Sequence, residues 1–227
     1  MRTIIKLPVW ITAALLILHA GAMAQVPVFE EPHHQVALLN SCLRLIDVHV
    51  KPGDTTLYHR HFNPSVVVFI TQNRTGSQPL GGSPSGGTAM PGKTFFAPYD
   101  QKPITHRVWN EDTSVYHVMD IEMLNKPGVH ALPLIKGEGV ELVQDEPMVR
   151  VYHFQIQPGH DITVPSDGFG KLLIGIHSSQ SEIELKSHAG SPVRLEPGQF
   201  KWLEGSEGFQ LRNNSTSDAE FVMLVCK

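Results

Sequence analysis

The sequence predicts an all-β protein built from two tandem antiparallel jelly-roll barrels. Segments of the chain match one another at an offset of 106 residues, so one structural unit occurs twice. Each copy consists of short β-branched and aromatic runs separated by turn signals. No convincing amphipathic helix follows the first 24 residues. Repeated short strands without helices are typical of a double-sheet sandwich or jelly roll.

The repeat sets the predicted domain boundaries. Residues 44–53 (RLIDVHVKPG) align with residues 150–159 (RVYHFQIQPG), and residues 66–70 align with residues 172–176. After a two-residue deletion Asn110 aligns with Asn214, and residues 115–121 align with residues 219–225. We therefore expect an N-terminal barrel over residues 25–124, a linker over 125–148 and a second barrel over 149–227. Residues 26–40 are expected to form an N-terminal arm on the barrel surface or interface.

The strands of the first copy are expected at residues 43–50, 66–71 and 115–123. Pro-Gly turns at residues 52–53 and 91–92 recur in the second copy at residues 158–159 and 197–198. The Gly-, Ser- and Pro-rich run at residues 76–92 is expected to be a flexible loop, and such a loop can also cover the mouth of a site.

The first 24 residues have the features of a secretory signal peptide. Arg2 and Lys6 precede an apolar run at residues 7–20, and Ala22-Met23-Ala24 resembles a cleavage site. A buried core helix is the alternative, which the terminal position and the flanking residues disfavour. Cleavage after Ala24 would leave a mature chain that is periplasmic or secreted and has no further membrane segment.

The charge balance narrows the class of expected partners. Without Arg2 and Lys6 the chain has 16 basic against 22 acidic residues, a net charge of −6, and it shows no basic patch for nucleic acid. The expected partner is a small-molecule ligand or substrate, and a homodimer stays open.

Cys42 and Cys226 are the only cysteines. They form either a disulfide, which an oxidising compartment favours, or two buried thiols.

Three of the 13 histidines carry the predicted chemistry. His59 and His61 are separated by one residue in an extended run, so their imidazoles point to the same side of a strand. His106 comes from a later strand-like run and can complete a three-nitrogen metal site with open positions. The alternative is that all three are hydrogen-bonded interior histidines. Other histidines are expected to be solvated (His33, His34, His130, His160, His188) or to have packing roles (His49, His117, His153).

These two stretches resemble the motifs of the cupin superfamily, and the repeat resembles a two-domain bicupin. The first motif is matched by Gly53, His59 and His61, but Ser65 (or Val66) stands at its Glu position and its later glycine is displaced to Gly76. The second motif is matched by Gly92, Pro98, His106 and Asn110, with Asp100 in place of a glycine. The resemblance covers nearly all of the mature chain.

The resemblance implies that His59, His61 and His106 bind a divalent metal: iron, zinc, manganese, nickel or copper. It also implies that the second copy has lost the site, since Pro165, Asp167 and Gln210 stand at the histidine positions. Without the Glu ligand a divalent site keeps a charge of about +2, which favours a bidentate anion. The alternative interpretation of Ser65 is that the protein has lost catalytic activity and that the metal is structural.

Two functions follow from the resemblance. The first is an exported three-histidine metal-dependent dioxygenase acting on a small organic anion, with no catalytic acid or base assigned. The second is a non-catalytic cupin that binds a sugar or carboxylate, or a structural protein of the cell envelope. Aromatic residues near both motifs are expected in the core or in the pocket walls (Phe62, Phe95, Phe96, Tyr99, Trp109).

Overall fold

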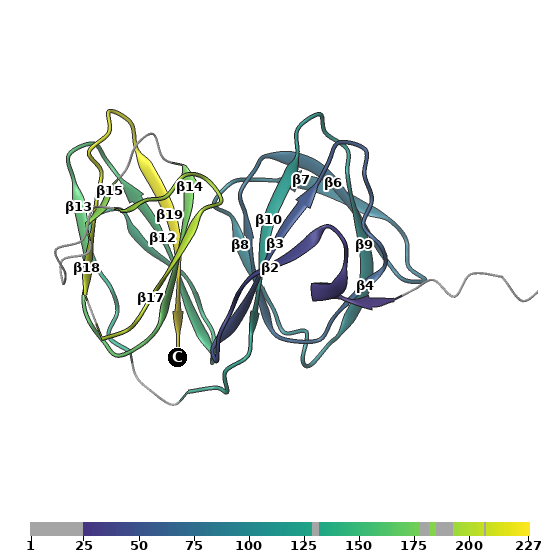
Figure 1. Ribbon diagram of the computed structural model, residues 1–227, viewed down its shortest axis with the longest axis horizontal. Helices are drawn as coiled ribbons and strands as arrows, with labels where there is room; N and C mark the ends of the chain where they lie inside the picture. The colour runs from purple at the N-terminus through teal and green to yellow at the C-terminus, as the bar shows by residue number, and fades with distance from the viewer. Residues whose placement is uncertain (1–24, 129–131, 178–181, 185–192, 207) are drawn as a thin grey trace, which may run out of the picture.

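The computed structural model describes residues 25–128, 132–177, 182–184, 193–206 and 208–227, so the predicted signal peptide lies outside the described residues. Strands dominate this part of the chain, which contains one short 3-10 helix (Figure 1). The elements of the first half are β1 (Val26–Pro27), η2 (Val28–Glu30), β2 (His34–Leu39), β3 (Leu43–Val50), β4 (His59–His61), β5 (Ser65–Phe69), β6 (Asn73–Pro79), β7 (Ser85–Ala89), β8 (Thr94–Ala97), β9 (Ile104–Asn110) and β10 (Tyr116–Met123).

The second half repeats this arrangement. Its strands are β11 (Val140–Asp145), β12 (Val149–Ile156), β13 (Asp161–Val164), β14 (Lys171–His177), β15 (Glu182–Glu184), β16 (Val193–Arg194), β17 (Phe200–Leu203), β18 (Phe209–Arg212) and β19 (Ala219–Cys226). The order β2-β3-β10-β5-β8 in one sheet matches β11-β12-β19-β14-β17 in another. The order β4-β9-β6-β7, extended by β1, matches β13-β18-β15-β16. Two antiparallel double-sheet barrels confirm the predicted fold class.

The structure corrects the alignment of the two copies near their ends. The Asn110 amide donates to the carbonyls of Val50 (2.9 Å) and Ser114 (2.7 Å). In the second barrel it is Asn213, not Asn214, whose amide donates to the equivalent carbonyls of Ile156 and Ser217, both at 2.7 Å. The deletion between the copies is therefore three residues. It lies in the connection between β17 and β18, because β8 and β17 still match at the 106-residue offset.

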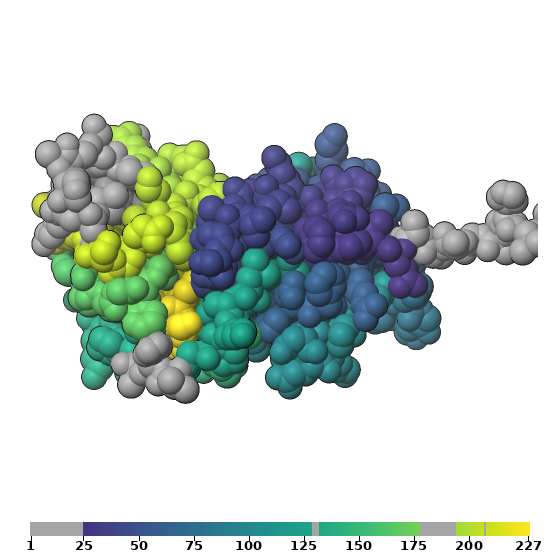
Figure 2. Space-filling view, turned by 60° about the horizontal axis from the view of Figure 1, so that its bottom comes forward, coloured from purple at the N-terminus to yellow at the C-terminus, as the bar shows by residue number. Residues whose placement is uncertain are grey.

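The segments expected to form a linker and an arm contain strands of the barrel sheets. Within the predicted linker 125–148, β11 is hydrogen-bonded to β12 and forms the edge of a sheet of the second barrel. Within the predicted arm, β2 pairs with β3 in the same way, and both pairs carry a register shift at the same place. Only β1 and η2 then form an added arm, and β1 runs parallel to β4. Figure 2 shows this N-terminal segment in purple on one face of the first barrel.

The run at residues 76–92 is a hairpin rather than a loop. β6 and β7 pair over residues 73–77 and 85–89, and Gly81 turns the chain with a φ of +74°. A glycine is needed at position 76, because a Cβ there would lie 2.1 Å from the Trp109 indole ring. Glycine usually weakens a strand, so the glycine-rich composition of this run predicted a loop instead of the hairpin.

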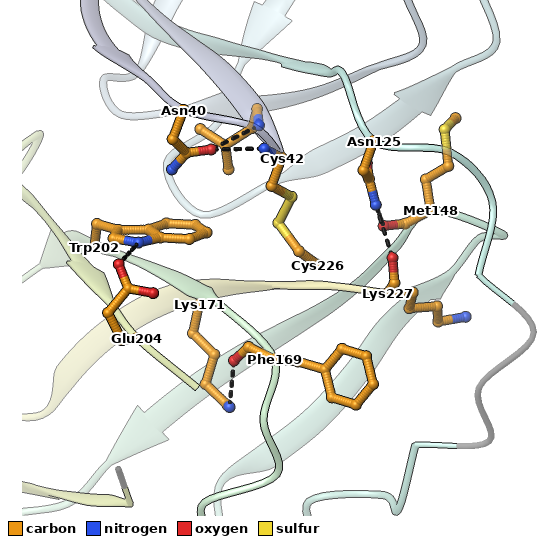
Figure 3. The surroundings of a disulfide bond; sticks show 11 residues. Asn40, Cys42, Asn125, Met148, Phe169, Lys171, Trp202, Glu204, Cys226 and Lys227 are labelled. Atoms are coloured by element: carbon orange, nitrogen blue, oxygen red, sulfur yellow. Dashed lines mark hydrogen bonds between the residues drawn. A yellow bond between two sulfur atoms is a disulfide. The ribbon is translucent and has the colours of Figure 1, made fainter. Parts of the chain in front are cut away.

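The barrels pack against each other through β3, β5 and β10 of the first and β12, β14 and β19 of the second (Figure 1). The interface is a continuous apolar cluster that includes Leu45, Ile121, Val151 and Leu224. At its edge Cys42 and Cys226 form a disulfide, with a Cα separation of 6.4 Å (Figure 3). The disulfide alternative is therefore correct, and it joins the start of one barrel to the end of the other.

Candidate metal centre

The three predicted histidines meet on the inner face of the first barrel. His59 and His61 are two residues apart on β4, so their side chains point to the same face of the sheet. His106 on β9 lies opposite His59 in the antiparallel pairing of the two strands. One ring nitrogen from each lies within 4.8 Å of the other two. The Nε2 atoms of His61 and His106 are 3.0 Å apart. Strand alternation and strand pairing together produce the convergence that the sequence pattern predicted.

The other nitrogen of each ring contacts the surrounding protein. His59 Nδ1 lies 2.9 Å from the carbonyl oxygen of Leu57. His106 Nδ1 lies 3.1 Å from the Ser77 hydroxyl oxygen. His61 Nδ1 lies 3.1 Å from a carboxylate oxygen of Asp120. With Nδ1 of each ring held from outside, the Nε2 atoms are the ones left to face a common point, as in protein metal sites.

The donor set fits a divalent metal. Two nitrogens each about 2.1 Å from one ion and at right angles to each other lie about 3.0 Å apart, which is the separation of the His61 and His106 Nε2 atoms. Burial, followed by the nearby imidazoles, lowers the pKa of His59 to about 3 and that of His106 to about 2. Both rings are therefore neutral near pH 7 and keep a lone pair for coordination. Without a metal, the same 3.0 Å contact is an imidazole–imidazole hydrogen bond.

Asp120 supplies the negative charge that the missing Glu would have provided. Its carboxylate lies on β10, is buried, and comes within 3.1 Å of His61 Nδ1 without forming a well-aligned hydrogen bond. Burial alone would raise the pKa of Asp120, but interactions with His61 and Ser65 lower it below its usual value. Ser65 itself is buried and donates to the Asn63 carbonyl at 3.3 Å. A buried carboxylate of this kind needs a nearby cation, which a metal at the three imidazoles would provide.

The histidines line a cavity of about 350 Å³. A site of this size suits a small molecule. Its imidazole, phenol and carboxylate side chains come from five strands or loops: His34, His59, His61, Tyr99, His106 and Asp120. Its apolar wall is formed by valines and phenylalanines on both sheets: Val48, Val50, Val67, Phe69, Phe95 and Val108. The cavity thus offers a ligand both polar side chains and apolar walls.

The aromatic residues near the motifs divide between the cavity and other roles. Phe95 and Tyr99 line the cavity, and burial, followed by the charge of Asp120, raises the pKa of Tyr99 to about 12. Phe96 packs against the interface core between the barrels. Phe62 lies edge-on to Phe29 with ring centroids 6.2 Å apart, and the Trp109 indole packs on Gly76.

The second barrel has no comparable centre among the described residues. A buried apolar cluster fills its interior: Ile162, Val164, Phe209, Leu211, Phe221 and Met223. The three-residue deletion places Phe209, rather than Gln210, at the position of His106, and Phe209 pairs with Val164. Asp167 forms an ion pair with the buried Lys171. Apolar side chains and an internal ion pair thus replace the imidazoles.

The histidines on the interface side have structural contacts. His117 Nε2 lies 2.6 Å from Asp47 in the first barrel, and His153 Nε2 lies 2.6 Å from Glu220 in the second. Asp47 occupies the position that His153 has in the second barrel, and His117 occupies the position of Glu220, so the acid and the histidine are exchanged. The two contacts confirm the packing roles expected for His117 and His153. His49 stacks on His117 with ring centroids 4.0 Å apart and belongs to a second possible metal-binding group with Asp47. In stacked rings the nitrogen lone pairs of His49 and His117 run nearly parallel and do not converge on one point. The geometry therefore suits the contact between His117 and Asp47 better than a shared metal ion.

Sequence reasoning missed three residues near the centre. His34 was expected to be solvated, but its side chain is only 5% exposed and lines the cavity. Glu31, which contacts His34, has a fully buried side chain. Asp120 carried a usable signal, because an acid in the middle of an apolar strand run marks a buried charge. The neighbouring pair His33-His34 carried none, since only tertiary structure shows which of the two faces inward.

Comparisons with known proteins identify the fold. No family model matches the chain, and no curated protein matches it. Solved structures do match. AerE from Microcystis aeruginosa is 13% identical, with a TM-score of 0.57 over 87% of this chain and 98% of AerE. YhaK from Escherichia coli is 14% identical, with a TM-score of 0.55 over 83% of this chain and 87% of YhaK.

Salicylate 1,2-dioxygenase from Pseudaminobacter salicylatoxidans is 8% identical, with a TM-score of 0.58 over 82% of this chain and 71% of the dioxygenase. A structure of that dioxygenase with gentisate adducts also matches, at 9% identity, with a TM-score of 0.58 over 82% of this chain and 68% of the dioxygenase. At these identities the similarity concerns the fold alone. The chain has a cupin-like fold of antiparallel jelly-roll barrels, as the two motifs implied.

Proposed function

We propose that this protein is an exported bicupin whose first barrel binds one divalent metal through His59, His61 and His106 and oxidises a small organic anion. The observation that carries the proposal is the convergence of three imidazoles whose second nitrogens are held by Leu57, Asp120 and Ser77. Ligands oriented from outside in this way are typical of functional metal sites. Three protein ligands also leave coordination positions for a substrate.

The charges and walls of the site define the class of ligand. A bound divalent metal would supply Lewis-acid chemistry, polarising a coordinated oxygen and lowering the pKa of a coordinated hydroxyl. Asp120 reduces the charge of about +2 expected for three neutral imidazoles to about +1, so a monoanion would neutralise the centre. The apolar wall would hold the remainder of the ligand and exclude water.

The solved structures suggest which anions to test first. The salicylate 1,2-dioxygenase structures share the fold, and one of them contains gentisate. Hydroxybenzoates are monoanions near neutral pH and have a planar apolar ring, which suits a cavity with both polar side chains and apolar walls. They are therefore the first substrates to test in oxidation assays.

Several features support export. Residues 1–24 have the pattern of a cleaved signal peptide. The Cys42–Cys226 disulfide favours an oxidising compartment such as the periplasm. Among the residues that the structure describes, none lies in a helix with the length and apolar character needed to span a bilayer. Fractionation of the producing cells tests the location, and size-exclusion chromatography tests the open question of a homodimer.

Elemental analysis of the purified mature protein is the first experiment. We expect one divalent metal per chain, lost in the His59→Ala/His61→Ala double variant. His117→Ala is the matched control, because it removes a histidine outside the site and should leave the metal content unchanged. Wild type without a metal would overturn the proposal.

Oxygen consumption by the iron-loaded protein with salicylate, gentisate and related anions then separates two functions. Turnover that depends on His106 supports the dioxygenase. Tight metal and anion binding without turnover supports the non-catalytic binding protein instead, and an unchanged rate in His106→Ala contradicts a reaction at this centre.

A further inference from the structure

The start of β2, shortly after the N-terminal arm, brings a fourth imidazole to the edge of the metal centre. The arm strand β1 lies beside β4, with Val26 opposite His59. After η2 the chain enters β2 at His34, whose ring centroid is 4.6 Å from that of His59. His34 lines the same cavity as the three candidate metal ligands but lies outside their cluster.

Glu31 fixes the orientation of this imidazole. Its carboxylate contacts His34 Nδ1 in a short hydrogen bond and accepts from the Leu57 amide at 3.0 Å. It also accepts from the His33 amide at 2.7 Å, and His33 Nδ1 lies 3.0 Å away. The Leu57 carbonyl in turn contacts Nδ1 of His59. Glu31 thus ties the arm, His34 and the backbone that holds a candidate metal ligand into one network.

The carboxylate determines which nitrogen of His34 is available. An ionised carboxylate can only accept hydrogen bonds, so Nδ1 of His34 carries the proton that Glu31 accepts. In the neutral ring Nε2 then has the lone pair and accepts a hydrogen bond. Because the ring lines the cavity, this acceptor is available to a bound ligand.

We propose that His34, oriented by Glu31, recognises a hydroxyl group on the anion that occupies the metal centre. The inference rests on the proposed function, because it requires an anion at the three imidazoles. It narrows the ligand class to monoanions that carry a separate hydroxyl group, such as hydroxy acids. His34 acts as a specificity-determining residue, and Glu31 as the positioning residue behind it.

His33 provides a matched control. Both histidines contact the same carboxylate, but the His33 side chain is 25% exposed and also lies 3.8 Å from Asp54 outside the cavity. His33→Phe and His34→Phe make the same substitution at adjacent positions. Phenylalanine keeps a planar ring and removes the acceptor nitrogen. Any effect of His34→Phe that His33→Phe does not share therefore belongs to the cavity.

The test uses the full mature protein loaded with Co²⁺, whose absorption reports anion binding. Benzoate and the 2-, 3- and 4-hydroxybenzoates are titrated into wild type and both variants. We expect at least one hydroxybenzoate to bind wild type more tightly than benzoate. In His34→Phe this preference should fall about tenfold, the loss expected for one hydrogen bond, while benzoate affinity stays within about threefold. His33→Phe should keep the wild-type preference.

Each other outcome has a defined meaning. An undiminished hydroxyl preference in His34→Phe overturns the inference, and so does an equal loss for benzoate and hydroxybenzoates, which would indicate a purely structural role. A wild type that binds benzoate as tightly as every hydroxybenzoate overturns it as well. Failure of wild type to take up Co²⁺ instead removes the proposed function, because that result precedes any contribution of His34.

Discussion

Lys171 lies in the second barrel where Ser65 lies in the first. Ser65 pairs with Glu122 and Ala97, and Lys171 pairs with Val225 and Leu203 at the equivalent register positions. Both side chains are fully buried and face the barrel interior. The Lys171 ammonium forms an ion pair with Asp167. It also donates to the Phe169 carbonyl at 2.9 Å (Figure 3). The second barrel thus carries an internal ion pair at the position where the first barrel has a buried serine.

Replacement of Lys171 by Met should destabilise the protein strongly. The substitution leaves the Asp167 carboxylate buried without its cation, a change that typically costs about 3–5 kcal/mol. The double variant Lys171→Met/Asp167→Leu removes both charges and should recover most of the loss. Urea unfolding measures the free energy of unfolding for both. Equal stability of the single variant and wild type would show that water reaches this pair.

The sequence was sufficient to predict the fold class and the three candidate ligands. Repeated motifs define the barrels directly, and alternation along a strand places His59 and His61 on one face without knowledge of any partner strand. The disulfide could be suggested but not decided, since proximity of Cys42 and Cys226 depends on how two barrels pack.

Residues that reach the site through strand pairing could not be assigned in the same way. Asp120 enters from β10, the neighbour of β5, and His34 enters from the first residue of β2, next to the Glu31 that is bonded to the loop before β4. Their roles depend on contacts between segments distant in sequence. The shift from Asn214 to Asn213 has a similar cause, because a hydrogen-bonded turn fixes the register more sharply than apolar similarity does.

Asp120→Asn should weaken metal binding without removing it. The asparagine keeps the shape of the side chain but loses the charge that contacts His61 Nδ1. Loss of such a supporting carboxylate commonly reduces metal affinity about 10- to 100-fold. Competition with a chromophoric chelator measures the Zn²⁺ affinity. Asp47→Asn, which removes a carboxylate from a histidine outside the site, is the control and should bind as wild type does. Identical affinities for wild type and Asp120→Asn would exclude the supporting role.

The metal-free protein should lose stability as the pH falls below about 6.5. His59 and His106 have folded-state pKa values of about 3 and about 2, whereas unfolded histidines take up protons near pH 6.5. Between these limits the unfolded chain binds more protons, so each histidine lowers the free energy of unfolding by up to about 1.4 kcal/mol per pH unit. Urea unfolding at pH 7, 6 and 5 measures the slope, which His106→Leu should reduce. A free energy of unfolding that does not change from pH 7 to pH 5 contradicts the prediction.

Protonation of Glu31 should cause a second loss of stability at lower pH. Burial acts to raise its pKa, but hydrogen bonds from His34, His33 and Leu57 lower it to about 2. Its stabilising contribution is complete above the unfolded value of about 4.5 and disappears as the pH falls toward 2. Glu31→Gln should therefore show a shallower decline than wild type below pH 4.5 and the same decline above it. Parallel curves below pH 4.5 would mean that this carboxylate is not preferentially ionised in the folded protein.

Removal of the disulfide should destabilise the protein while leaving the metal centre intact. Cys42 and Cys226 are separated by 184 residues, so their bond restricts the unfolded chain over most of its length. The chain-entropy model gives an upper limit of about 5 kcal/mol for such a loop. We expect Cys42→Ala/Cys226→Ala to unfold at lower urea concentration than wild type and to keep its metal, because the interface core still joins the barrels and the three histidines belong to one of them. Dithiothreitol should lower the wild-type midpoint toward that of the variant and leave the variant unchanged. A wild type insensitive to reductant, with two cysteines that alkylate freely before reduction, would show that the purified protein lacks the bond.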